Sequence, residues 1–177
     1  GRAEFVPLAA NRTKEGRTIW KDQKSPNGII PTLRNLFRHR VDGTWIAWRQ
    51  VDESGDIPDQ RIAMDNPASF TLRRIPLTDE QVTSFYHVTS KESFWPILHT
   101  FPTYFNINNA DWKVFEDVNK RFAEAACFEA GKGATVWVHD YNLWLAPYYI
   151  RLERPDLKIA FFHHTPFPGN DVFAILP

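Results

Sequence analysis

Two groups of polar residues near the end of the sequence could do chemistry. His-Asp-Tyr stands at 139–141 and His-His-Thr at 163–165, and a short apolar segment precedes each group. Asp140 can accept hydrogen bonds from vicinal hydroxyls, and His164 can donate one to a hydroxyl or to a departing oxygen. Together with two anion-binding positions earlier in the chain, this combination suits a phosphorylated, polyhydroxylated ligand.

Two positions earlier in the chain could bind the anionic part of such a ligand. Arg12 carries a planar fork of donors that suits a phosphate. Gly28 follows Pro-Asn in a turn, just before the start of an expected helix, where main-chain amides can bind an anion and a side chain would block its approach. On this motif alone, an ordinary turn glycine is the simpler interpretation of Gly28.

A metal site is the alternative interpretation of the polar groups. His139, Asp140, His163 and His164 are all of the residue types that bind metal ions. Adjacent side chains at a strand end point to opposite faces, so only one histidine of the 163–164 pair would face a common ion. We therefore favour a site without a metal. The sequence also has no nucleophile elbow, Walker phosphate loop or dinucleotide fingerprint, so hydrolase and NTPase activities lack support.

The apolar patterning predicts the elements that must position these side chains. The runs 134–138 and 158–162 are short and continuous, as in strands buried on both faces of a parallel sheet, and a helical pattern that stops before Pro155 lies between them. Together they predict a βαβ unit. Since parallel strands end at the same edge of a sheet, the two polar groups should share one rim, with Arg12 and Gly28 beside them.

Further elements complete the expected α/β fold, an open and mostly parallel Rossmann-like sheet with helices on both faces. A first strand is predicted within Glu4–Arg12. An antiparallel pair of strands is predicted at Gly43–Val51 and Ser69–Leu77, joined by a charged loop. Thr78 and Gln81 form a capping-box pattern for a helix that runs toward Ser90, and an amphipathic helix precedes Gly131.

Composition bounds the class of protein. The 177 residues suffice for one domain or a piece of one. Because 21 basic side chains balance 21 acidic ones, the net charge does not favour binding to nucleic acid or to an anionic membrane. Neither a membrane-spanning run nor a signal peptide is recognisable. Cys127 is the single cysteine, and its alanine-rich surroundings indicate a buried structural thiol. We expect a soluble, cytoplasmic protein.

Two motifs carry a resemblance to a known family. The stretches "ATVWVHDYNLWLAPYYIR" and "KIAFFHHTPFPGNDVFAILP" closely resemble the trehalose-6-phosphate synthase family, glycosyltransferase family 20, whose members carry V-W-x-H-D-Y and F-x-H-x-P-F-P. Ala-Asn-Arg at 10–12, Asn-Gly at 27–28 and Tyr86 with Trp95-Pro96 follow the family's order. The resemblance implies a retaining glycosyltransferase with two Rossmann-like lobes, the GT-B type. This chain would be its incomplete amino-terminal, acceptor-binding lobe, inactive alone, with the donor lobe beyond Pro177.

The resemblance also implies roles for binding residues. Arg12 would hold the acceptor phosphate, and Gly28 would lie against the diphosphate of the donor. Tyr86 and Trp95 would line the acceptor pocket, although aromatic residues on a helix are usually part of the core. The partners would therefore be a nucleotide sugar and a phosphorylated acceptor.

At the reacting centre, the resemblance implies roles for Asp140 and His164. Asp140 would hydrogen-bond sugar hydroxyls, and His164 would contact the transferred glucose and help to stabilise developing charge. The family is thought to react by front-face attack, assisted by the leaving phosphate, which accounts for the lack of a general acid and base pair of carboxylates. No metal and no cofactor is implied.

Within the family, the chain is most similar to the branch that transfers glucose from ADP-glucose to sn-glycerol 3-phosphate, which makes a compatible solute for salt tolerance. The features of that branch are "SPNGIIPTL", where trehalose enzymes usually have Gly-Gly, and the doubled histidine of "HHTPFP". His163 then marks the branch or merely packs. The alternatives are a trehalose-6-phosphate synthase that uses UDP-glucose and glucose 6-phosphate, and a non-catalytic sugar-phosphate binding or regulatory module.

Overall fold

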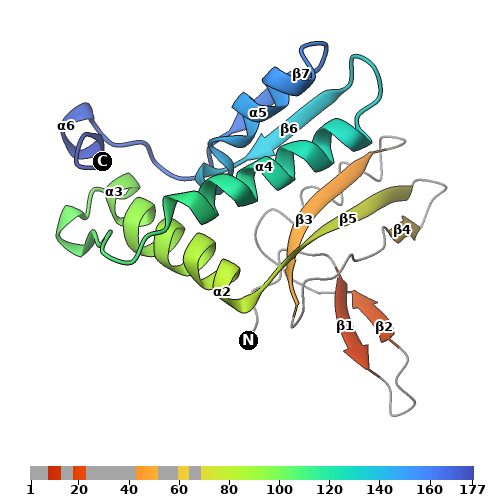
Figure 1. Cartoon of the computed structure of the whole chain (residues 1–177), viewed down its shortest axis with the longest axis horizontal. Coiled ribbons are helices and arrows are strands. Elements are labelled where there is room, and N and C mark those ends of the chain that lie inside the picture. The colour runs from red at the N-terminus through yellow and green to blue at the C-terminus, as the bar shows by residue number, and fades with distance from the viewer. Residues whose placement is uncertain (1–7, 13–17, 23–42, 52–59, 64–68) are drawn as a thin grey trace. The chain divides into compact units, whose positions relative to one another are not determined.

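The computed structural model of the chain forms two compact units, residues 1–77 and 78–177 (Figure 1). It describes residues 8–12, 18–22, 43–51, 60–63 and 69–177. The Gly28 turn and the helix expected after it lie outside the described residues. No helix in the described part of the chain is long and apolar enough to cross a membrane.

The first unit contains a two-stranded and a three-stranded sheet. β1 (Leu8–Arg12) pairs antiparallel with β2 (Thr18–Asp22), so the expected first strand does end at Arg12. The second sheet has the order β3-β5-β4, from strands β3 (Thr44–Gln50), β4 (Gln60–Ala63) and β5 (Ser69–Leu77).

The pairing of β3 with β5 corrects one expectation. Both strands form where predicted, but they run parallel, with Thr44 opposite Thr71, rather than as an antiparallel pair. Parallel strands need a long crossover connection, whereas a tight hairpin turn joins antiparallel strands. The connection 51–68 is long enough for a crossover. Part of that connection forms β4, which occupies the other edge of β5 and runs antiparallel to it.

A long helical segment opens the second unit. α2 (Asp79–Val82) continues as a π-helix, η1 (Thr83–Phe94), and then as α3 (Trp95–Leu98). The expected capping box is present: Gln81 N–H donates to the Thr78 hydroxyl at 3.3 Å, and Thr78 N–H donates to the Gln81 side chain at 3.0 Å.

This segment runs past Ser90, where the helix was expected to stop, and past Pro96. Pro96 has no N–H to donate to the carbonyl of Glu92, four residues earlier. Asn106 N–H donates to that carbonyl instead, at 3.1 Å. A donor from outside the segment thus satisfies one carbonyl in the turn before Pro96.

The long helix α4 (Trp112–Glu129) confirms the predicted amphipathic helix and packs against η1. Asp111 caps it by accepting a hydrogen bond from Val114 N–H at 3.2 Å. Phe115 on its buried face meets Phe85 and Phe94 of η1, with ring centroids 5.6 and 5.2 Å apart. The packed aromatic rings fix η1 relative to α4.

The βαβ unit follows α4 and confirms the predicted parallel pair. It consists of β6 (Thr135–His139), η3 (Tyr141–Leu143), α5 (Ala146–Glu153) and β7 (Lys158–Phe162). β6 and β7 are parallel, with His139 opposite Phe162. The remaining short elements are η2 (Pro102–Tyr104) and α6 (Asn170–Phe173).

The two strands are not buried on both faces as expected. Val138 is buried, but Trp137 on the opposite face of β6 is 45% exposed, and Phe162 of β7 is 48% exposed. A continuous apolar run shows that both faces are apolar. It does not show whether this part of the chain covers both.

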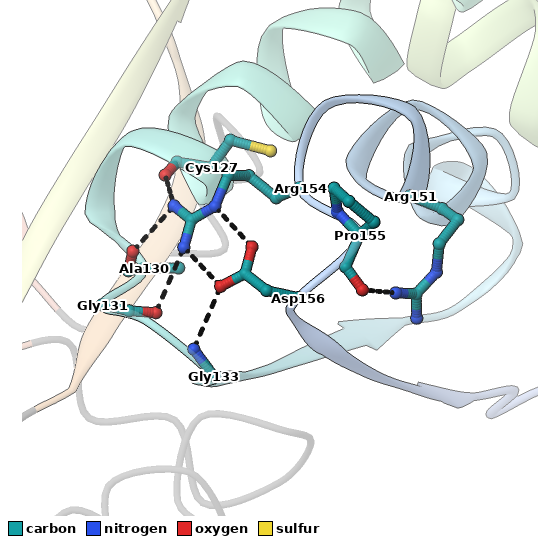
Figure 2. Close-up of polar contacts among 8 residues, drawn as sticks. All are labelled: Cys127, Ala130, Gly131, Gly133, Arg151, Arg154, Pro155 and Asp156. Atoms are coloured by element: carbon teal, nitrogen blue, oxygen red, sulfur yellow. Dashed lines mark hydrogen bonds and ion pairs between the residues drawn. The ribbon is translucent and has the colours of Figure 1, made fainter.

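An arginine latch joins the end of α4 to the strands (Figure 2). The guanidinium of Arg154 donates to three main-chain carbonyls and to Asp156, which also accepts from Gly133 N–H at 3.1 Å. The carbonyls belong to Cys127 and Ala130, both at 3.0 Å, and to Gly131, at 3.4 Å. Since a helix end leaves carbonyls without partners, the latch satisfies them and fixes the turn into β6. Cys127 itself is buried, as expected, and burial raises the pKa of its thiol.

Candidate active site at the strand ends

The two polar groups meet at one rim of the βαβ unit, as the sequence predicts. Asp140 N–H donates to the carbonyl of Phe162 at 2.8 Å, which continues the pairing of the strands by one residue. Beyond it, His139 Nδ1 lies 2.9 Å from His164 Nε2. The hydroxyl of Thr165 lies 3.5 Å from Asp140 Oδ1.

The buried Asn119 of α4 holds the segment that follows this rim. Its amide nitrogen donates to the carbonyls of Phe115 and Asn142, at 2.9 and 3.1 Å. Its oxygen accepts from the N–H groups of Leu145 and Ala146, both at 3.1 Å. A fully buried amide with all of these partners positions the connection between β6 and α5 rigidly.

Asp140 adopts a strained backbone conformation. Its φ of 67° and ψ of 166° fall in a region that is almost reserved for glycine, and such strain of about 1–3 kcal/mol clusters at functional sites. Its carboxylate accepts from Tyr141 N–H at 3.0 Å and so caps η3. The geometry supports a functional role for Asp140, because a glycine would fit this backbone better.

His139 and His164 are hydrogen-bonded to each other at the rim. Of two imidazole nitrogens in hydrogen-bond contact, one must carry the hydrogen and the other must accept it. The pKa of His139 is lowered, mainly by burial and also by His164, while the charge of Asp140 opposes this effect. The ring of His164 is exposed, so it is the one of the two that can reach a ligand.

His163 points into different surroundings from His164. Its ring stacks on Trp144, with centroids 5.8 Å apart, and its Nδ1 lies 2.8 Å from the carbonyl of Thr165. His163 therefore packs against Trp144, and a role in marking the branch stays a prediction. Among residues 43–51 and 70–177, whose side chains are described, no three His, Cys, Asp or Glu side chains are arranged to hold a metal ion.

Tyr86 lies close enough to Asp140 to interact with its charge. Burial is the main cause of the raised pKa of Tyr86, and Asp140 adds to it. Trp95 is 37% exposed and stacks on His99, with centroids 3.9 Å apart. No described contact joins Trp95 to Asp140 or to His164, so its role in an acceptor pocket stays a prediction.

Lys91 is a candidate site residue that the sequence analysis did not name. Its Nζ lies 5.3 Å from the centre of the Tyr86 ring and 5.8 Å from that of Tyr141. Burial lowers the pKa of the Lys91 ammonium, and the charge of Asp140 partly offsets this. A π-helix hydrogen-bonds residues five apart, so Lys91 lies beside Tyr86. An α-helical pattern brings together residues that are three and four apart. The sequence pattern therefore did not indicate that Lys91 and Tyr86 are neighbours.

The anion-binding roles expected of Arg12 and Gly28, both in the first unit, stay predictions. Arg12 ends β1, but its side chain is not described, and Gly28 lies outside the described residues. Tyr141 is the last residue of the His-Asp-Tyr group, and the sequence analysis gave it no role of its own. Its hydroxyl is buried without a hydrogen-bond partner in the described part of the chain, and burial strongly raises its pKa.

Comparison with known proteins gives one family. The model of glycosyltransferase family 20 matches residues 3–177. A glucosylglycerol-phosphate synthase from Synechocystis is 52% identical over 171 residues, which cover 93% of this chain and 33% of that protein. A trehalose-6-phosphate synthase from Mycolicibacterium gilvum is 39% identical, over 99% of this chain and 34% of that protein.

Solved structures give the same fold. A trehalose-phosphate synthase from Burkholderia xenovorans, solved with glucose-6-phosphate, has a TM-score of 0.72 at 23% identity, over 88% of this chain and 34% of that one. A structure from E. coli with bound UDP-2-fluoro glucose has a TM-score of 0.74 at 22% identity, over 88% and 34%. The likeness confirms the expected α/β fold of one lobe of a GT-B enzyme. The chain spans about a third of the length of the relatives it matches.

Proposed function

The chain belongs to glycosyltransferase family 20, and from this premise we propose that it is the amino-terminal, acceptor-binding lobe of a retaining glucosyltransferase. The observation that carries the proposal is the strained Asp140, held at a rim with the His139–His164 pair and close to Tyr86. A carboxylate kept in an unfavourable backbone conformation beside hydrogen-bond donors suits the recognition of sugar hydroxyls.

The proposed reaction is glucosylglycerol-phosphate synthesis, from ADP-glucose and sn-glycerol 3-phosphate. The chain is 52% identical to the glucosylglycerol-phosphate synthase of Synechocystis. This exceeds its 39% identity to the trehalose-6-phosphate synthase of Mycolicibacterium gilvum. Asn27, where trehalose enzymes usually have glycine, favours the same branch. The product would be a compatible solute made under salt stress, and the lone buried thiol of Cys127 fits a cytoplasmic location.

In the proposed mechanism, this lobe binds and orients the acceptor. The acceptor hydroxyl forms a bond to the anomeric carbon on the face from which the diphosphate departs, and its proton passes to an oxygen of the leaving phosphate. Asp140 accepts hydrogen bonds from sugar hydroxyls near that carbon, and His164 donates to the transferred glucose. Arg12 and Gly28 would bind the acceptor phosphate and the donor diphosphate. Because the leaving group takes the proton, this chain need supply no carboxylate base.

The test is an assay with the longest natural polypeptide that contains this chain. ADP-glucose or UDP-glucose is paired with glycerol 3-phosphate or glucose 6-phosphate, and released nucleotide diphosphate is measured. We expect ADP-glucose with glycerol 3-phosphate to be the productive pair. Activity only with UDP-glucose and glucose 6-phosphate would identify a trehalose-6-phosphate synthase instead. No activity with any pair would contradict the enzyme and favour a non-catalytic sugar-phosphate binding module.

A further inference from the structure

We propose that Lys91 binds the phosphate of the acceptor and thereby helps to select a short phosphorylated polyol. The inference rests on the proposed function, because that function supplies the phosphorylated acceptor. It assigns a role to a residue that neither the motifs of the sequence nor the roles implied by the family resemblance include.

The first support is the position of the ammonium group. Lys91 belongs to η1, yet its Nζ lies 5.8 Å from the ring centre of Tyr141, which directly follows the strand-end Asp140. On its other side it lies 5.3 Å from the ring centre of Tyr86, on its own helix. The charge is thus held between the π-helix and the rim by two aromatic faces, each of which attracts a cation.

The second support is the absence of an anionic partner within the described part of the chain. No carboxylate among those side chains lies within ion-pair distance of Lys91. Lys120 offers a comparison: it also lies over a tyrosine ring, 5.2 Å from the centre of Tyr149, but it forms an ion pair with Glu116 at 2.9 Å. Lys91 forms no such pair with the described side chains, and because the residue is exposed, an anionic ligand can reach its ammonium.

The third support is the polar surroundings of Lys91. The buried hydroxyl of Tyr141 has no described partner, so it is free to donate to a ligand oxygen. The charge of Asp140, at the rim, favours the protonated form of Lys91 and so partly offsets the lowering of its pKa by burial. An acceptor with phosphate at one end and hydroxyls at the other would place its phosphate at Lys91 and its hydroxyls at Asp140. Glycerol 3-phosphate has both groups on three carbons.

The experiment compares Lys91→Met with the wild type in the longest natural polypeptide that contains this chain. We expect the KM for glycerol 3-phosphate to rise about 10- to 100-fold, the size of one lost charge-assisted hydrogen bond, while the KM for the nucleotide sugar stays within a few-fold. Lys91→Arg should retain most of the affinity. Lys120→Met is the matched control, since it removes a lysine from a tyrosine face away from the rim, and it should leave both KM values unchanged.

Calorimetric titration of glycerol 3-phosphate separates the inference from the proposed function. If the wild type makes no product but binds glycerol 3-phosphate through Lys91, the proposed function fails and the inference stands. If the wild type is active and Lys91→Met binds glycerol 3-phosphate as tightly, the inference is overturned alone. A wild type that does not bind glycerol 3-phosphate overturns it as well. Lys91→Gln, which keeps a polar side chain, provides the same comparison if the methionine variant does not fold.

Discussion

At the scale of single residues, Asp140 links the backbone of the site to its chemistry. The backbone conformation favours glycine, and the carboxylate caps η3 by accepting from Tyr141 N–H. Sequence reasoning found Asp140 from its place after an apolar strand, but the strain was not visible there. The dihedral angles depend on how the turn between β6 and η3 is held by the surrounding structure, including Asn119.

The strain at Asp140 can be measured with two substitutions. Asp140→Gly and Asp140→Ala both remove the carboxylate and its hydrogen bonds, but only alanine keeps the clash at a φ of 67°. We expect the glycine variant to be the more stable by about 1–2 kcal/mol in the free energy of unfolding, measured by urea denaturation. Both variants should lose glucosyl transfer. Equal stability, or a more stable alanine variant, would contradict the strain.

The two adjacent histidines should respond differently to substitution. His164 is exposed at the rim and contacts His139, whereas His163 packs on Trp144. In the full-length enzyme, we expect His164→Ala to lower kcat/KM by about 100-fold or more, because it removes a donor to the reacting sugar. His163→Leu, the control, keeps an apolar contact and should remain within several-fold of the wild type. The opposite ranking in a steady-state assay would reverse the assignment.

At the scale of elements, the sequence predicted best where a periodic pattern is local. The 3.6-residue spacing of α4 and the capping box at Thr78 were both confirmed. The direction of β3 relative to β5 was wrong, because it depends on the route of a long connection and on β4. The π-helical register of η1 was not predicted either, since its spacing is not the one that an α-helical pattern tests. That register is what places Lys91 near Tyr86.

The latch in Figure 2 gives a test of how the elements are joined. Arg154→Met removes hydrogen bonds to three carbonyls at the end of α4 and the contact with Asp156. We expect the Arg154→Met variant to unfold at a temperature several degrees lower than the wild type. Thermal unfolding is monitored by circular dichroism. Arg151→Met is the matched control, because Arg151 donates a single bond, to Pro155 O at 2.7 Å, from the same helix. Equal effects of the two variants would show that the latch adds nothing.

The pH dependence of the latch follows from Asp156. The hydrogen bond with Arg154, and then that from Gly133 N–H, hold the pKa of this carboxyl well below its usual range. A carboxyl with a lowered folded-state pKa stabilises the fold above its unfolded value, near pH 4, and loses this contribution as the pH falls through the folded value. The melting-temperature difference between wild type and Asp156→Asn should therefore be constant from pH 6 to 8 and shrink below about pH 4. A difference that persists undiminished at pH 2 would contradict this.

At the scale of the whole molecule, the chain corresponds to about a third of its relatives. The family and the α/β fold were predictable, since two motifs of the βαβ unit carry the resemblance and both strands formed in place. The burial of those strands was not predictable. The exposed faces of Trp137 and Phe162 show that an apolar strand need not be covered by the part of the protein that contains it.

The proposed role as an acceptor-binding lobe predicts that this chain does not catalyse glucosyl transfer by itself. The proposed front-face reaction needs the donor diphosphate to be neutralised by basic side chains, which the family resemblance assigns to the donor lobe. The 177-residue chain, with its 21 basic and 21 acidic side chains, has no excess of charge to substitute for them. We expect this chain alone to make no glucosylglycerol phosphate from ADP-glucose, in an assay where the longest natural polypeptide does. Robust transfer by the isolated chain would show that the reacting centre is complete within these residues, and it would overturn its assignment as an acceptor-binding lobe.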